Sequence, residues 1–342
     1  MSGNLKLSCP SGGSVTVSAA DTASNVTATI PAATDTLVNL TSTQTLTNKT
    51  LTAAGTNTVE ATSGPTSTQL SGNRNKIING AMMIDQRNAG ASVTPTNGGY
   101  TLDRWKAYVS QASKLTVQQN AGSVAPPSGY QNYLGITSSS AYSVGASDYF
   151  ALSQPIEGYN FADMAWGTAS AKTVTLSFQV YSSLTGTFGG ALSNYQTTRS
   201  YPFTYTVSSA NTWTSVSVVI PGDTNAAWAS GGNTTSLVGC YMFFGLGVGS
   251  SGSGTAGSWS SAQYWSATGA TSVVGTNGAT FYITGVQLEK GATATPFENR
   301  LYGTELALCQ RYYQKSFDLG VAPANGLGDY RPWYPASINT GG

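Results

Sequence analysis

Ala279-Thr-Phe-Tyr-Ile-Thr-Gly-Val-Gln-Leu-Glu-Lys-Gly-Ala-Thr-Ala-Thr-Pro-Phe-Glu-Asn-Arg300 is the stretch of the sequence that decides the fold. Its apolar residues keep one parity before Gly285 and take the other parity after it: Phe281 and Ile283, then Val286 and Leu288. Because strand side chains alternate between two faces, this switch predicts a strand interrupted by a bulge or twist at the glycine. A turn at residues 289–291 and then proline end the strand. We interpret the stretch as the closing strand of a β-sandwich.

Further strand patterns recur upstream, separated by turns rich in Gly, Ser and Asn. The clearest is Val174–Val180, in which apolar and polar residues alternate strictly. About nine antiparallel strands with long loops are typical of a two-sheet sandwich or jelly roll, so we expect an all-β fold. The predicted strands are Tyr100–Val109, Leu115–Gln118, Tyr133–Thr137, Tyr149–Ile156, Val174–Val180, Phe203–Val207, Trp213–Ile220, Val238–Val248 and Phe281–Leu288.

The domain organisation follows from where this pattern starts and stops. Residues 76–300 form the expected jelly-roll domain, opened by an edge strand within Lys76–Arg87, and residues 53–75 form a linker without periodicity. In residues 301–342 we predict one short helix, Glu305–Tyr312, with Thr304 as its candidate cap. A strand at Arg311–Phe317 would start a C-terminal module.

Residues 1–52 form an extended arm with two predicted strands, Val15–Ala19 and Val26–Ile30. No aromatic residue precedes Tyr100, so the arm has almost nothing with which to build a core of its own. Such a ribbon buries its apolar side against copies of itself or a larger assembly. The alternative is a flexible tail.

Composition excludes several classes of partner and of chemistry. Only 8% of the 342 residues are charged, the formal net charge is +1, and histidine is absent. A neutral surface gives no electrostatic attraction to nucleic acid or anionic membranes, so we expect neither as a partner. Three distant cysteines, Cys9, Cys240 and Cys309, show no metal-ligand spacing and read as free thiols of a chain that matures in a reducing cytoplasm.

Catalysis and bound metal are not expected from this sequence. A polysaccharide depolymerase needs two carboxylates placed across the scissile bond, and the acids between residues 76 and 300 form no recognisable pair. We also find no coil repeat typical of β-helical tailspikes. Glu289, with Asp85 or Glu157, is a weak candidate for a Ca²⁺ site, and the Asp103-Arg104 pair has a structural interpretation as a buried ion pair. We expect no cofactor.

Four aromatic residues are candidates for sugar binding, because flat rings stack on the C–H faces of pyranoses. Trp259, Tyr264 and Trp265 lie in a loop of Gly, Ser, Ala and Thr between residues 249 and 277, and Trp228 has a similar setting. The alternative is that this loop packs on the sandwich or on a neighbouring subunit. Trp105 and Trp213 lie in alternating strands and are expected in the core.

Three groups of short motifs occur in order along the chain. They are Leu5-Lys-Leu, Ser11-Gly-Gly-Ser-Val-Thr-Val and Thr45-Leu-Thr-Asn-Lys-Thr-Leu51 in the arm; Asn79-Gly-Ala-Met, Gln86-Arg87 and Asp103-Arg-Trp105; and Gly285-Val-Gln-Leu-Glu-Lys-Gly-Ala-Thr-Ala-Thr-Pro-Phe-Glu298 with Leu308-Cys-Gln-Arg-Tyr-Tyr313. Together they resemble tailed-bacteriophage virion proteins described as tail fibres. The resemblance implies a homotrimer with an N-terminal virion-attachment arm, a jelly roll similar to carbohydrate-binding modules, and a C-terminal knob after the helix.

The function expected from these observations is that of a non-enzymatic virion structural protein, assembled in the cytoplasm of a bacterial host. Its arm, residues 1–52, would hold other virion proteins, and its jelly roll would bind host surface polysaccharide for adsorption, with avidity from three chains per fibre. The alternative is a capsid decoration protein, or head fibre, that stabilises the shell; a depolymerase is the least favoured of the three.

Overall fold

The computed structural model describes residues 5–8, 14–17, 73–228, 238–315, 318 and 321, in two units, Met1–Glu60 and Ala61–Gly342. In the first unit, β1 (Leu5–Ser8) pairs antiparallel with β2 (Ser14–Val17). Strand β2 overlaps the predicted strand Val15–Ala19 but starts one residue earlier and ends at Val17, and its partner is β1. The predicted strand Val26–Ile30 lies outside the described residues.

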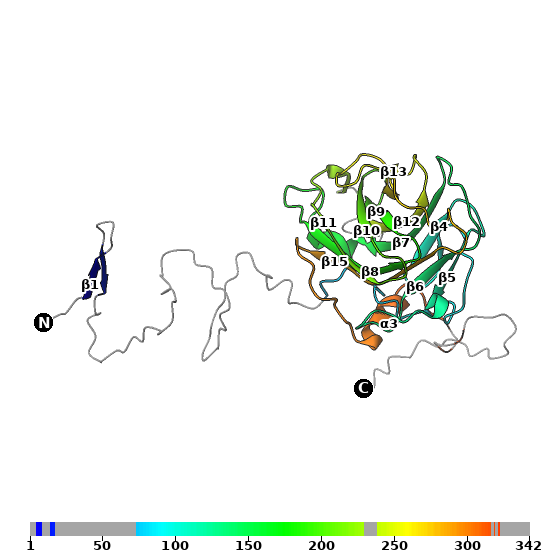
Figure 1. Cartoon of the computed structure of the whole chain (residues 1–342), viewed down its shortest axis with the longest axis horizontal. Coiled ribbons are helices and arrows are strands. Elements are labelled where there is room, and N and C mark those ends of the chain that lie inside the picture. Colours follow the sequence, from blue (N-terminus) through cyan, green and yellow to red (C-terminus); the bar gives the residue numbers. More distant parts are fainter. Residues whose placement is uncertain are drawn as a thin grey trace, which may run out of the picture. The chain divides into compact units, whose positions relative to one another are not determined.

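The second unit is a sandwich of two antiparallel sheets (Figure 1). One sheet has six strands in the order β10-β9-β12-β7-β4-β3, and the other has five in the order β11-β8-β15-β6-β5. The bounds in the first sheet are β3 Gly99–Tyr100, β4 Lys106–Val109, β7 Tyr149–Glu157, β9 Gly186–Asn194, β10 Ser200–Val207 and β12 Val238–Val248. Those in the second are β5 Leu115–Gln119, β6 Leu134–Ser138, β8 Val174–Ser182, β11 Thr214–Ile220 and β15 Thr280–Lys290.

Short elements complete the described part of the domain. A two-residue parallel pair, β13 (Ser253–Gly254) and β14 (Ser266–Ala267), lies within the loop after β12. The 3₁₀ turns are η1 (Ala121–Ser123), η2 (Ala162–Met164) and η3 (Ala226–Trp228), and the helices are α2 (Gly158–Phe161) and α3 (Tyr302–Gln310). None of the helices in the described ranges is long and apolar enough to span a membrane.

Strand β15 confirms the strand and the bulge predicted for the opening stretch, but Glu289 and Lys290, assigned to a turn, continue the pairing with β8. It lies between β8 and β6, and its register with β8 shifts between Thr284 and Gln287, where Gly285 has a φ of 61°. The bulge reverses the parity of the side chains. Residues on both sides of Gly285 therefore reach the same core, and Phe281, Ile283, Val286 and Leu288 are all fully buried.

The all-β sandwich is confirmed, with three differences in its strands. Tyr100–Val109 is two strands, because a turn with Arg104 at a φ of 72° separates β3 from β4. Lys76–Arg87 contains no strand, although its apolar residues Ile77, Ile78, Met82 and Ile84 are buried. The pattern missed β9, because Gly186–Asn194 is rich in glycine and contains no β-branched residue beyond Thr187.

The C-terminal segment also differs from its prediction. Helix α3 starts at Tyr302 after Leu301, so Thr304 lies inside the helix rather than at its cap. Cys309 of α3 packs on Ile78 and Ile84. Residues 311–315 form a turn and irregular chain instead of a strand, because their side chains bind the sandwich individually: Arg311 and Tyr312 both bind Glu157.

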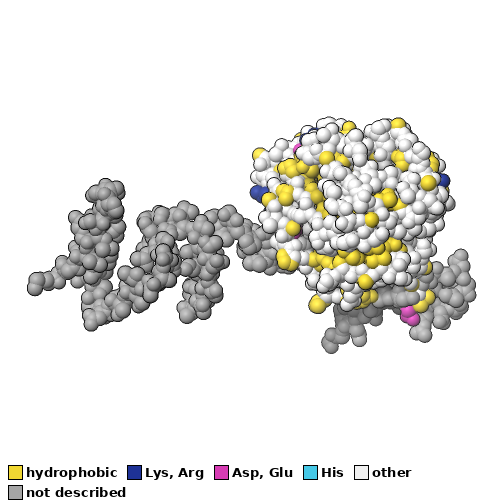
Figure 2. Space-filling view, viewed as in Figure 1, with side chains coloured by type: hydrophobic (Ala, Val, Ile, Leu, Met, Phe, Trp, Pro, Cys, Tyr) yellow, Lys and Arg dark blue, Asp and Glu magenta, His cyan; other side chains and the backbone are white. Residues whose placement is uncertain are grey.

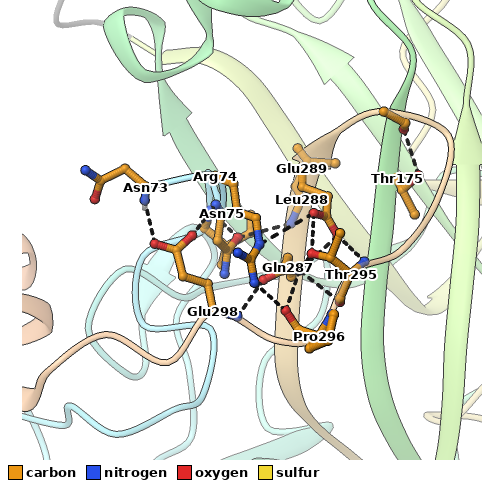
Figure 3. Close-up of polar contacts among 12 residues, drawn as sticks. Asn73, Arg74, Asn75, Thr175, Gln287, Leu288, Glu289, Thr295, Pro296 and Glu298 are labelled. Carbon is orange, nitrogen blue, oxygen red and sulfur yellow. Dashed lines mark hydrogen bonds and ion pairs between the residues drawn. The ribbon is translucent and has the colours of Figure 1, made fainter. Parts of the chain in front are cut away.

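A polar cluster joins the chain segment that enters the sandwich to the segment that leaves β15. We call it the clasp (Asn73, Arg74, Asn75, Glu289 and Glu298; Figure 3). The Glu298 carboxylate accepts the backbone N–H groups of Asn73 and Asn75, each at 2.7 Å. Arg74 donates to the Pro296 carbonyl at 2.6 Å and lies 3.7 Å from the Glu289 carboxylate. Residues 73–75, assigned above to the linker, thus bind the segment that follows β15.

Candidate functional site

Ladder register places a set of rings on the outer face of the six-stranded sheet. On β12, Phe244 packs in the core, so Tyr241 and Phe243, of the opposite parity, point outward. Residues opposite one another in a ladder share a face. One outward row therefore contains Lys106 of β4, Ser153 of β7 and Phe243 of β12. Tyr108, two residues after Lys106 on the same face of β4, lies opposite Ala151 of β7.

The rings contact one another, and we call Tyr108, Tyr149, Tyr241, Phe243 and Trp265 the aromatic face. Tyr241 stacks on Phe243 at 5.8 Å between centroids, and Tyr108 meets Phe243 edge-on at 5.9 Å. Trp265 lies 4.9 Å from both Tyr108 and Phe243 and stacks on Tyr149 at 4.6 Å. Phe243 is buried, and the other four are half-buried. The arrangement thus presents ring surface that remains partly accessible.

Small residues let a loop reach this face. A Cβ on Gly245 would lie 2.4 Å from the hydroxyl of Ser266, and a Cβ on Gly189 would lie 2.6 Å from it. The short β14 segment therefore lies directly on the sheet, which glycine at both positions permits. Its neighbour Trp265 is held against Tyr108 and Tyr149 as a result.

A single ammonium group borders the rings. Lys106 Nζ lies 4.9 Å from the ring centroid of Tyr100 and 5.9 Å from that of Tyr108, both within cation–π range. Burial, and then the nearby Arg104 guanidinium, lower the pKa of Lys106. Burial also raises the pKa of Tyr108 to about 12 and, helped by Tyr195 and Tyr100, raises that of Tyr241.

The four predicted sugar-binding residues do not form one site. Trp265 belongs to the aromatic face, whereas Trp228 is only 2% exposed and its indole N–H binds Asp223 at 2.8 Å. Trp259 is half-buried beside Trp228, at 5.6 Å, and donates to the Pro221 carbonyl. Tyr264 is half-buried within its own loop, its ring against Gly254. Packing of this loop on the sandwich explains why the side chains of Trp259 and Tyr264 are half-buried.

Sequence reasoning missed Lys106, Tyr108 and Tyr241. A signal exists for Lys106 and Tyr108, since they share one parity while Ala107 and Val109 take the buried parity. Tyr241 similarly has the parity opposite to the core residues Met242 and Phe244. Which parity faced the core could not be read in β12, because nearly every residue there is apolar or glycine.

A second ring cluster covers part of the other sheet and is less open. Tyr133 and Tyr282 stack at 5.0 Å but are buried, and residues 121–125 lie over them: Tyr133 donates its hydroxyl to the Ala121 carbonyl, and Trp213 donates its N–H to Ala125. Trp213, expected in the core, is instead a half-buried member of this cluster, because it precedes β11 and faces outward. Trp105 is fully buried, as predicted.

The acidic candidates are engaged with separate partners. Asp103 accepts from Gln86, while Arg104 donates to the Pro155 carbonyl and lies 3.5 Å above the Tyr312 ring, so the two are buried but not paired with each other. Asp85 accepts backbone N–H groups, and Glu289 accepts from Thr295. Within the described ranges, no three His, Cys, Asp or Glu residues are grouped as metal ligands would be.

No protein-family model and no curated protein matches this sequence. Solved structures are similar at low identity. The enzymatically active domain of bacteriophage CBA120 tailspike protein 4 is 11% identical with a TM-score of 0.35, over 64% of this chain and 22% of that one. A family 11 carbohydrate-binding module of the Clostridium thermocellum cellulase Lic26A-Cel5E is 10% identical with a TM-score of 0.29, over 60% of this chain and 99% of that one. The module CBM4 is 16% identical with a TM-score of 0.30, over 62% of this chain and 98% of that one.

The fold and the face together define the class of protein. The described chain is an antiparallel β-sandwich that presents rings, with one cation, on the outside of its six-stranded sheet. Its surface otherwise carries few charges, and Figure 2 shows blue and magenta side chains only at scattered points of the side in view.

Proposed function

We propose that the protein is a non-catalytic, glycan-binding structural protein of a bacteriophage virion, and that the aromatic face is its glycan site. The observation that carries the proposal is the partly accessible ring surface of Tyr108 on β4 and Tyr241 on β12, with Trp265 of the loop after β12 packed against Tyr108. Rings held by strands stack on the C–H faces of sugars without losing further side-chain freedom on binding.

The proposed fibre is a homotrimer held on the virion by residues 1–52. Support comes from the motif resemblance and from the composition of the arm, which lacks aromatic residues. A single shallow face binds a sugar weakly, and three faces per fibre raise the avidity without any new contact. Light scattering of the full-length protein should give the mass of three chains; a monomeric mass would contradict the fibre.

Electron microscopy of labelled virions separates the two structural roles. Label at tail positions favours the fibre, and label at capsid lattice points favours a decoration protein.

Glycan binding is tested by presenting the full-length protein to an array of host surface polysaccharides. We expect Tyr241→Ala and Trp265→Ala to weaken binding by about tenfold or more, at about 1–2 kcal/mol for a lost ring contact. Trp213→Ala, in the cluster on the other sheet, is the matched control and should bind normally. Equal binding by all three variants would exclude the aromatic face.

The absence of catalysis is part of the same proposal. Asp85, Asp103, Glu157 and Glu289 are each occupied by protein partners. Asp148, which precedes Tyr149, is likewise engaged by the hydroxyls of Ser110 and Tyr142. Incubation with a bound polysaccharide should therefore release no oligosaccharide. Release of reducing ends by the wild-type protein would favour a depolymerase instead.

A further inference from the structure

We propose that the aromatic face selects acidic saccharides, with the Lys106 ammonium group pairing with the carboxylate of a uronic acid whose ring stacks on Tyr108 and Tyr241. This inference rests on the proposed glycan-binding function and specifies its ligand. It follows from the position of Lys106, from the charges around it and from the scarcity of charge elsewhere.

Lys106 on β4 lies in the same outward row as Phe243 on β12, with Ser153 of β7 between them. Its ammonium group contacts the faces of Tyr100 and Tyr108, and among the described residues no carboxylate lies within ion-pair distance of it. A half-buried ammonium beside aromatic rings loses part of its hydration, and an ion pair would compensate for this loss. The position thus favours an anion from outside the chain.

The neighbouring charges strengthen this preference. Arg104 is close enough to Lys106 to lower its pKa, and Arg87 lies 4.8 Å from the Tyr100 ring, which also contacts Lys106. The acidic residue on this side of β7 is Glu157, and both of its carboxylate oxygens are engaged, by Arg311 and by the Tyr312 hydroxyl. The described charges that lie beside Lys106 and Tyr100 are therefore cationic, while Asp148, next to Tyr149, accepts from Ser110 and Tyr142.

Charged side chains are scarce in much of the rest of the sandwich. Between residues 173 and 288 the only charged side chains are Arg199 and Asp223, which pair at 2.6 Å. Here an ammonium group with no ion-pair partner among the described residues lies against half-buried rings. A uronic acid matches both features, because it has a C–H face for the tyrosines and a carboxylate at the edge of the same ring.

The experiment compares three acidic polymers, polygalacturonate, alginate and glucuronan, each beside its carboxyl-reduced counterpart, in which the same linkage carries neutral sugars. Affinity of the full-length protein is measured by gel retardation and calorimetry at low and high salt. We expect at least one acidic polymer to bind about tenfold more tightly than its reduced form, an advantage that falls with salt.

Variants assign the effect to the lysine. Lys106→Gln should remove the preference for the acidic polymer, whereas Lys106→Arg should keep most of it. Lys172→Gln removes the same charge from an exposed position before β8 of the other sheet and should leave the preference unchanged. Unchanged unfolding midpoints establish that the variants are folded.

The possible results separate this inference from the function on which it rests. Equal affinity for acidic and reduced polymers, with binding still lost in Tyr241→Ala, would overturn the acidic preference and leave glycan binding intact. Neutral glycans bound on the array with none of the acidic polymers bound would do the same. No binding to any polymer or array glycan would overturn both. A preference that survives in Lys106→Gln would exclude Lys106.

Discussion

The Glu298 carboxylate accepts the backbone N–H of Asn75 at 2.7 Å, although 223 residues separate the two in the chain. With its second oxygen on Asn73, this one side chain joins the residues that enter the sandwich to the segment that leaves β15. The Arg74 bond to the Pro296 carbonyl joins the same two segments, so the clasp closes the sandwich at more than one point.

Loss of the clasp should destabilise the sandwich. Glu298→Ala removes two hydrogen bonds from backbone N–H groups to a charged acceptor that is 11% exposed, and we expect the free energy of unfolding to fall by about 2 kcal/mol. Glu298→Gln keeps one acceptor oxygen and should lose less. Denaturant unfolding measures both; identical midpoints for wild type and Glu298→Ala would show that the clasp adds no stability.

The bulge in β15 should not tolerate a side chain. Gly285 has a φ of 61°, and a Cβ there would lie 2.5 Å from the Tyr130 ring. Gly278 has a φ of 73° with nothing within 4 Å, so Gly278→Ala pays only the conformational cost of about 1 kcal/mol. Gly285→Ala should lose at least about 1 kcal/mol more. Equal losses in thermal unfolding would mean that Tyr130 moves aside freely.

Asp223 should be essential for the Trp228 region. Its carboxylate accepts from Arg199 Nε at 2.6 Å and from the Trp228 indole at 2.8 Å, and its side chain is 5% exposed. Asp223→Asn leaves a largely buried guanidinium without its counter-charge, so we expect a loss of about 3 kcal/mol.

The control for this change is Asp163→Asn. Asp163 pairs with Lys76 at 3.0 Å, but its side chain is 48% exposed, so the loss should stay below about 0.5 kcal/mol. Comparable losses for the two variants in denaturant unfolding would contradict a special role for Asp223.

Removing the Ser153 hydroxyl should stabilise the protein or leave its stability unchanged. Ser153 is fully buried beneath the aromatic face, and its Oγ has no hydrogen-bond partner among the described residues. An unsatisfied buried hydroxyl costs about 1–3 kcal/mol, which Ser153→Ala would relieve. Ser182→Ala is the matched control, since Ser182 donates to the Thr280 carbonyl and should lose about 1 kcal/mol. A clear loss in Ser153→Ala would reveal a partner for this hydroxyl.

Stability should fall at alkaline pH in a way that depends on Tyr108. Burial raises its folded-state pKa to about 12, whereas tyrosine in the unfolded chain titrates near about 10. The folded state holds the proton over this interval, so its stability is fully present below pH ~10 and decreases as pH rises toward ~12. Tyr108→Phe should flatten this decrease in unfolding experiments, with tyrosinate absorbance as a direct readout. The same slope in both proteins would exclude a contribution from Tyr108.

Much of the fold could be predicted from local pattern. Strict alternation located β8, and the parity switch at Gly285 located the bulge in β15, because burial of one face imposes period two on a strand. The same logic failed for β9, where Gly190 is required by a tertiary contact: a Cβ there would lie 2.2 Å from the Phe243 carbonyl. A contact of that kind leaves no periodic signal.

The sequence by itself determined the fold class of this protein: an antiparallel sandwich with few charged side chains, preceded by an arm without aromatic residues. Only the tertiary structure decided which rings are accessible. Trp228 and Trp265 have similar neighbours in sequence, but η3 buries one against Asp223 while the loop after β12 lays the other on Tyr108. Exposure depends on which segments pack over a residue, and residues far away in the chain supply those segments.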